Sequence, residues 1–293
     1  MAKKQSKDMK KEKTAEKQGA KGEHAEKRQD NAPSLKAVWQ LLKPNKSALA
    51  YMLFVDAAFV MAAFFFRRFV ELIAPSLTPE ALVANATLAL YGLALVVVYY
   101  LLVLLLYSLA KFFVMHLIKG MKSSEGLQFD RFFPFYGLNV MLTGIFFLIM
   151  LSLAYIFAAL KQPYEVAGFL VLVVPYLLVL FVVLNSAHSM FFAKRKVAWG
   201  SIVSAFKFAF NSMRQYGFVL GWNAVFGAVF VIVLFVPGML IRSFADNPAL
   251  YASSYKAFSV ATSTLSTFVL YCMAIFSRVG FYLAVEAKDD LSS

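Results

Sequence analysis

The sequence predicts an all-α fold, a polytopic transmembrane bundle of about six helices, and three observations lead to this prediction. Hydrophobic residues occupy 61% of the 293 positions and charged residues 15%, whereas a soluble domain is about 45–50% apolar and about 25% charged. The apolar residues gather in runs of roughly 18 or more, each long enough to cross a hydrocarbon core of about 30 Å. Lysine and arginine collect in the first 33 residues and between the apolar runs. Basic residues mark the cytoplasmic side, so a disordered basic tail and in-plane amphipathic helices are expected on that side.

Residues 34–293 are expected to form a single transmembrane domain. Its six spans cover about residues 48–68, 84–109, 138–160, 168–190, 217–241 and 260–286. Turn and cap signals separate the spans. Thr78 can cap the second helix and Pro79 suits its first position. Asn247-Pro248 is the expected breaker between the fifth and sixth spans.

Residues 1–33 differ in composition from the rest and are expected to form a disordered tail. They include nine lysines, one arginine and six acidic residues, with no aromatic and no branched aliphatic residue. Such a segment buries too little apolar surface to offset its ordering entropy, and it lacks the apolar core of a secretory signal peptide. One interpretation is a solvated tether. The other is attraction to anionic lipid headgroups or, weakly, to nucleic acid.

Both termini are expected in the cytoplasm of a multi-pass protein of the cell membrane. With the tail inside, nine basic residues fall on inner segments and five on outer ones, and basic residues mark the cytoplasmic side. The nine are Lys111, Lys119, Lys122, Arg131, Lys194, Arg195, Lys196, Lys207 and Arg214; the five are Arg67, Arg68, Lys161, Arg242 and Lys256. The lipid bilayer and its anionic headgroups are therefore the first partners that the sequence predicts.

Residues 194–217, KRKVAWGSIVSAFKFAFNSMRQYG, carry five positive charges and no acidic residue between two apolar runs. Six residues recur at steps of three and four and so share one helix face: Trp199, Ile202, Phe206, Ala209, Met213 and Tyr216. An apolar face with a tryptophan, set in a basic inner loop, is typical of a helix lying in the headgroup plane. The expected headgroup contacts are Lys194, Arg195, Lys196, Trp199, Lys207 and Arg214.

A short aromatic-bearing inner segment followed by a helical hairpin occurs three times, beginning at residues 35, 127 and 202. Three such units in one orientation would be parallel repeats about an axis along the membrane normal, an arrangement seen in transporters. The pattern fits either a true duplication or three independent hairpins with basic loops. Gly217 and Gly221 stand four apart in the fifth span, a spacing that favours close approach of another helix.

The stretch VVPYLLVLFVVLNSAHSMFFA, followed by SIVSAFKFAFNSMRQYGFVLGWNAVFGAVF, resembles multi-span families of bacteria and archaea related to the membrane domain of glycerophosphoryl diester phosphodiesterases. The shared features are a Pro-bearing span, an inner S-x-x-x-A-x-x-x-A type helix and a Gly-rich span, over about residues 170–240. The phosphodiesterase activity of the namesakes resides in a separate soluble domain that is not found in this sequence. The resemblance therefore implies a membrane fold and carries over no catalytic residue.

No catalytic or cofactor signature appears, so an enzyme is the least favoured class. The sequence contains no HExxH, GxxxxGK[ST] or GxSxG pattern, and its single cysteine, Cys272, excludes a cysteine metal cluster. His116 and His188 are expected at matching inner ends of the second and fourth spans. They fit either ordinary interfacial histidines or a joint site for a metal ion or a headgroup.

Polar residues inside the apolar runs form the candidate site. Asp56 of the first span and Arg278 of the sixth each lie about 12 Å from the inner end of their span, at 1.5 Å per residue. We expect a salt bridge between them, because either charge alone would cost roughly 2.5–3.5 kcal/mol in the membrane. The other members of this polar set are Asn139, Asn185, Asn223, Thr267 and Tyr271. Together they form either a structural seam or a cytoplasm-facing cavity.

Two functions remain open at this point. The first is transport or lipid handling, with a small anionic or amphipathic ligand bound in that cavity around Arg278. The second is a non-catalytic membrane scaffold whose tail and in-plane helices recruit lipids or partner proteins. An open polar seam would favour the first function, and a closed bundle with Arg278 fully paired would favour the second.

Overall fold

The structure, a computed structural model, describes residues 34–73, 86–123, 126–160, 164–194, 196–244 and 246–290. These residues form helices and the turns between them, which confirms the predicted all-α class. The helices are α2 (Leu35–Leu42), α3 (Lys46–Ile73), α5 (Ala86–Gly120), η1 (Phe129–Arg131), α6 (Phe132–Ala158), α7 (Tyr164–Gly168), η2 (Phe169–Val173), α8 (Val174–Ala193), α9 (Ala198–Asn211), α10 (Met213–Arg242) and α11 (Pro248–Asp290). Six stretches are long and apolar enough to cross a membrane, as judged from length and composition. The expected tail, the cap signals at Thr78 and Pro79, and residues Lys161 and Arg195 lie outside the described residues.

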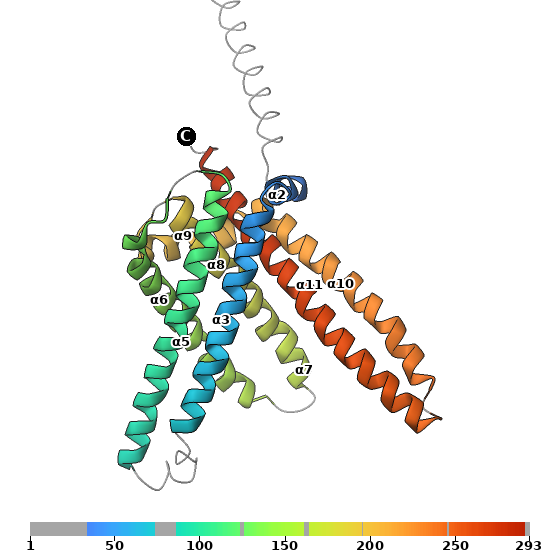
Figure 1. Ribbon diagram of the computed structural model, residues 1–293. Helices are drawn as coiled ribbons and strands as arrows, with labels where there is room; N and C mark the ends of the chain where they lie inside the picture. Colours follow the sequence, from blue (N-terminus) through green and yellow to red (C-terminus); the bar gives the residue numbers. More distant parts are fainter. Residues whose placement is uncertain are drawn as a thin grey trace, which may run out of the picture.

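The bundle consists of helical hairpins that diverge toward one end (Figure 1). α3 packs along α5 and α10 along α11, whereas α8 packs chiefly against α9 and α11. α2 and α9 lie at the same end as the C-terminus, which we call the terminal end. Toward the opposite end, called the open end, the α10–α11 hairpin leans away from α3. The short segments α2, η1 and α9 precede α3, α6 and α10, in the order that the repeat pattern indicates.

The hydrophobic core lies in the half of the bundle next to the terminal end. Large buried side chains from seven helices meet there: Val38, Met52, Phe112, Phe135, Phe191, Phe208 and Phe281. In the outer parts of α10 and α11, residues 222–242 and 248–268, no described side chain is buried. Apolar burial therefore holds the helices together at one end and leaves them apart at the other.

Two helices, α5 and α11, extend more than ten residues beyond one end of their predicted spans, and one of these corrections moves a charge into the bundle. α5 continues past residue 109 to Gly120, because neither glycine nor proline interrupts it. Lys111, expected on an inner segment, therefore lies within the helix and is 6% exposed. α11 begins at Pro248 rather than near residue 260, since Asn247 accepts a hydrogen bond from the Leu250 amide at 3.2 Å and so caps the helix.

The helix expected in residues 194–217 is present, but its faces are not those predicted. α9 ends at Asn211, and Ser212 leaves helical geometry (φ −131°, ψ 28°), so Met213 and Tyr216 belong to α10. The buried face of α9 consists of Ser201, Ile202, Ala205, Phe208 and Ala209, and it packs against α8 and α6. Trp199 lies off this face and is exposed. The predicted face was wrong because it joined residues across the break at Ser212.

The close helix contact in the last hairpin involves Gly280 rather than Gly217 and Gly221. No described atom lies within 4 Å of the Cβ that Gly217 or Gly221 would carry, whereas a Cβ on Gly280 would lie 2.7 Å from Cγ2 of Val219. α10 therefore approaches α11 where Val219 meets the bare backbone of Gly280. The sequence spacing of the two other glycines was a misleading signal.

We predict that Phe208→Ala lowers the melting temperature of the detergent-solubilised protein and that Trp199→Ala changes it little. Phe208 is 0% exposed and Trp199 is 60% exposed, and loss of a buried phenylalanine side chain costs about 3–5 kcal/mol. Thermal melts followed by circular dichroism, with wild type alongside, measure the difference. Equal losses from the two variants would contradict the buried face assigned to α9.

Candidate functional site

Asp56 of α3 and Arg278 of α11 form an ion pair inside the bundle. Nη1 of Arg278 donates a hydrogen bond to Oδ2 of Asp56 at 2.5 Å, and the side chains are 16% exposed for Arg278 and 19% for Asp56. The sequence predicted this pair from the equal depth of the two residues in their helices. Since α3 otherwise packs along α5, and α11 along α8 and α10, the pair ties the first hairpin to the last helix.

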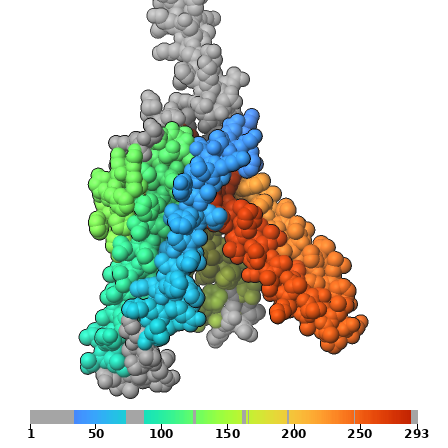
Figure 2. Space-filling model, in the orientation of Figure 1, coloured from blue at the N-terminus to red at the C-terminus, as the bar shows by residue number. Residues whose placement is uncertain are grey.

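The ion pair lies at the level where α3 and α11 begin to separate. On one face of α3, exposure rises from 19% at Asp56 to 63% at Val60, one turn nearer the open end. On the matching face of α11, exposure rises from 0% at Val285 to 16% at Arg278, two turns nearer the open end. Figure 2 shows that the surfaces of α3 and α11 part toward the open end and leave a hollow with residues of α7 and α8 behind it. We call this hollow the wedge.

The wedge faces the open end rather than the end of the termini, where the cavity was predicted. At the terminal end, the buried side chains of Val38, Ile118 and Tyr282 fill the space between the helices. Nζ of Lys122 also lies 2.6 Å from Oε2 of Glu286 and links the ends of α5 and α11. The polar residues do lie in the half that the sequence indicated. Only the packing decided which side of them is closed.

A polar stripe on α11 leads into the wedge. Tyr271 and Thr267 precede Arg278 by seven and eleven residues, which places them within about 20° of it around the helix. Oγ1 of Thr267 donates to the Ser263 carbonyl at 2.9 Å. The Tyr271 hydroxyl is buried close to the Asp56 carboxylate, without a hydrogen bond of full geometry to any described residue. The stripe thus connects the exposed part of α11 with the ion pair.

Lys111 of α5 is a second cation beside the ion pair. Its side chain is 6% exposed, and the charges of both Asp56 and Arg278 act on it. Within the described part of the chain, no hydrogen bond or ion pair involves Lys111. This cluster therefore contains two basic side chains and one carboxylate. Because uncompensated charge is expensive inside a membrane, a charged Lys111 requires an anion beside it.

His188 of α8 is the end of a hydrogen-bond chain that crosses three helices. The ring is 0% exposed, and its Nε2 lies 2.7 Å from Oδ1 of Asn139. Nδ2 of Asn139 contacts the Phe135 carbonyl at 3.2 Å and Oγ of Ser108 at 3.0 Å. A carbonyl can only accept, so Nδ2 is the donor and Oδ1 the acceptor. Ser108 passes the chain on by donating to the Leu104 carbonyl at 2.6 Å.

His188 belongs to the same charged cluster as the ion pair. The Tyr107 ring lies 6.4 Å from its ring between centroids, and Lys111 follows Tyr107 by one turn of α5. The sequence placed His188 at the interface beside His116. The structure instead buries it in the core, while the ring of His116 stacks on Phe112. In the described ranges, no group of three His, Cys, Asp or Glu side chains could hold a metal ion.

The two remaining asparagines predicted for the site have other partners. Nδ2 of Asn185 donates to the Phe181 carbonyl of its own helix at 2.8 Å. Nδ2 of Asn223 donates to Oγ of Ser277 at 2.7 Å, which joins α10 to α11 one turn from Gly280. Asn223 therefore supports the last hairpin, and Asn185 contributes no link between helices.

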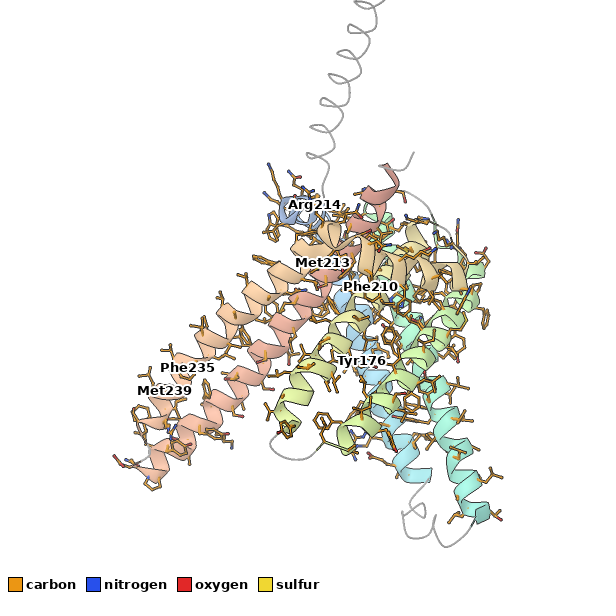
Figure 3. All side chains as sticks on the ribbon, turned by 180° about the vertical axis from the view of Figure 1, so that it is seen from behind. Tyr176, Phe210, Met213, Arg214, Phe235 and Met239 are labelled. Carbon is orange, nitrogen blue, oxygen red and sulfur yellow. The ribbon has the colours of Figure 1, made fainter. Side chains whose placement is uncertain are left out.

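The described residues predicted to contact headgroups lie near the terminal end. Lys194 is the C-cap of α8, and Nζ of Lys196 donates to Oγ of Ser204 at 2.7 Å. Arg214 is exposed beside Phe210 and Met213, where α9 meets α10 (Figure 3). Lys207 and Trp199 are exposed on α9. These side chains surround the end of the bundle, far from the wedge.

Sequence reasoning missed Lys111 and Ser108 as members of the site. The available signal was the apolar run FFVMHLI, which directly follows Lys111 and extends the second span beyond it. A lysine between two apolar runs was counted as a loop charge, although no breaker accompanies it. His188 was misplaced because contacts with other helices, among them those with Tyr107 of α5 and Phe135 of α6, bury it.

No protein-family model, curated protein or solved structure matches this chain. The fold and the site define its class by themselves. Over the described residues it is an α-helical protein with six helices long and apolar enough to span a membrane, and it holds buried charges where two of these helices diverge.

We predict that Asp56→Asn destabilises the protein more than Arg278→Gln does. Removal of Asp56 leaves Arg278 and Lys111 as neighbouring like charges, whereas removal of Arg278 leaves Asp56 with Lys111 as a cation nearby. Loss of one partner of a buried pair costs about 3–5 kcal/mol. Melting temperatures in detergent measure both effects.

The double variant Asp56→Asn/Arg278→Gln provides the control for this comparison. It should melt above the value expected from adding the two single losses, because it leaves neither charge of the pair alone. Strictly additive losses would show that the two side chains do not depend on each other.

Proposed function

We propose that this protein binds an anionic amphiphile in the wedge and carries it across the membrane. The anionic group would lie at the narrow end, next to Arg278, and the apolar part would lie between α3 and the α10–α11 hairpin. The observation that carries this proposal is a cluster with two basic side chains and one carboxylate at the narrow end of a hollow between helices.

The two walls of the wedge suit an amphiphile. α11 presents Tyr271 and Thr267 on the face of Arg278, whereas α3 presents Val60, which is exposed beyond Asp56. Phe268 of α11, next to the polar stripe, is exposed as well. A ligand with a charged group and an apolar body can satisfy both kinds of surface, which a small hydrophilic ion cannot.

The closed terminal end supports carriage rather than simple binding. Alternating access requires a site that is closed toward one side and open toward the other, with one unit that can rock against the rest. The α10–α11 hairpin is joined internally by Asn223 with Ser277 and by Val219 against Gly280. Rocking of this hairpin would change its contacts with the rest of the bundle, which are the packing of α11 on α8 and the Asp56–Arg278 pair with α3.

We place both termini in the cytoplasm, which directs the wedge outward, and we assign the exposed basic residues of the terminal end to anionic headgroups of the inner leaflet. The excess of lysine and arginine at this end supports the orientation. Kinship with the membrane domain of glycerophosphoryl diester phosphodiesterases is likewise a proposal, and it adds a membrane fold but no reaction.

A membrane scaffold is the second candidate function, and one observation favours it. Arg278 already has a carboxylate partner in Asp56, so the ion pair can serve only to hold α3 and α11 together. In that case the basic tail and the terminal end would recruit lipids or partner proteins without any ligand in the wedge.

We predict that the purified full chain, reconstituted in phosphatidylcholine vesicles, moves fluorescent phosphatidylglycerol between leaflets. Dithionite quenching measures the transfer. The double variant Asp56→Asn/Arg278→Gln should slow it by about tenfold, as expected for loss of a charged contact of about 1.4 kcal/mol. Arg242→Gln, the same chemical change at the far end of α10, should have no effect.

Equal transfer of fluorescent phosphatidylcholine, or full activity of the double variant, would contradict an anion-selective carrier. Absence of any transfer above protein-free vesicles would favour the scaffold function.

We predict, for the orientation, that Val197→Cys resists an impermeant thiol reagent added to intact cells and that Ser243→Cys reacts with it. Both substitutions are made in a Cys272→Ser background. Val197 is exposed at the start of α9, at the terminal end, and Ser243 is exposed at the outer end of α10. The opposite labelling pattern would turn the wedge toward the cytoplasm.

A further inference from the structure

Lys111 and His188 form a second polar group deeper in the bundle than Arg278. Both side chains are more than nine-tenths buried, and they come from α5 and α8. Lys111 lies one turn after Ser108 on α5, and Ser108 is joined to His188 through Asn139. Nδ1 of His188 is buried and has no partner among the described residues, and Lys111 likewise forms no hydrogen bond within them.

The hydrogen-bond chain determines which kind of group His188 presents. Oδ1 of Asn139 is an acceptor, because Nδ2 of the same amide donates to the Phe135 carbonyl. Nε2 of His188, 2.7 Å from this oxygen, must therefore carry the hydrogen. In the neutral ring, Nδ1 is then a bare acceptor. The buried group thus pairs an acceptor, Nδ1, with the three donor hydrogens of the Lys111 ammonium.

An acceptor beside an ammonium selects a particular class of ligand. A fully ionised oxyanion would match Lys111 but would set its lone pairs against Nδ1 of His188. An oxyanion that keeps one acidic hydroxyl matches both, because its charged oxygen accepts from Lys111 and its hydroxyl donates to Nδ1. A phosphate monoester in its singly charged form has this pattern, and a phosphodiester does not, since it has no hydroxyl on phosphorus.

We propose that Lys111 and His188 bind the singly charged head of a phosphate monoester, so that the amphiphile carried by this protein is a lipid of the phosphatidate type. This inference rests on the proposed function and names its substrate class. The ligand would reach Lys111 from the wedge past Asp56 and Arg278, whose charges act on Lys111. It would compensate the cation that the cluster otherwise leaves unbalanced.

The test is lipid binding by the full chain in detergent, followed by non-denaturing mass spectrometry. Dioleoyl phosphatidate and dioleoyl phosphatidylglycerol are titrated separately near pH 6, where about half of a phosphate monoester retains its second proton. Wild type should bind phosphatidate about tenfold more tightly than phosphatidylglycerol. Inorganic phosphate, assayed by its effect on the melting temperature, distinguishes a free anion from a lipid headgroup.

Two variants remove one half of the site each. Lys111→Met deletes the ammonium, and His188→Gln keeps a donor toward Asn139 while deleting the bare ring nitrogen. Each should abolish the tenfold preference for phosphatidate. Lys46→Met, the same change at an exposed position at the start of α3, should retain it. Without ligand, Lys111→Met should melt at or above the wild-type temperature, because it removes a buried charge that forms no ion pair with the described residues.

Each outcome separates this inference from the proposed function. If wild type binds both lipids equally, or if both variants keep the preference, the phosphate-monoester site is wrong, while anionic lipid binding that depends on Arg278 still supports a carrier. If wild type binds neither lipid, the carrier itself is contradicted. If inorganic phosphate stabilises wild type but not Lys111→Met, and phosphatidate does not bind, the site stands and its ligand is free phosphate.

Discussion

The pairing of Asp56 with Arg278 is the interaction on which the arrangement of the helices depends. It is the ion pair that the structure places between α3 and α11, and it lies at the boundary between buried and exposed side chains on both. Toward the terminal end, apolar packing holds the helices together. Toward the open end, the described side chains of the last hairpin, residues 222–242 and 248–268, are not buried. A single polar contact therefore stands at the point from which the two parts of the bundle diverge.

The second basic side chain of the cluster, Lys111, is present because α5 continues without a break to Gly120. A helix that continues through Lys111 brings an ammonium into the core next to an arginine that is already paired. A protein that only needed to fasten α3 to α11 would gain nothing from this lysine, since buried charge is costly in a membrane. We therefore connect Lys111 with a ligand, and the oriented chain from Leu104 to His188 gives that ligand its chemistry.

Much of the fold could be predicted because membranes impose simple rules on composition. Long apolar runs must be helices, since every backbone group has to be satisfied within its own segment. Depth along a helix is also readable, which is why Asp56 and Arg278 could be matched in advance. The errors occurred where a local signal had two meanings. Asn247-Pro248 was taken as a loop but caps α11, and the break at Ser212 interrupts a periodicity that looked continuous.

The sequence by itself determined the class of protein, the number of apolar helices and the pairing of Asp56 with Arg278, because these depend on length, composition and depth alone. Only the tertiary structure decided which end of the bundle is packed, and hence that the wedge faces away from the termini. It also decided that Lys111, Ser108, Asn139 and His188 meet. These contacts join different helices, and no spacing within one helix reveals which neighbour its polar side chains will face.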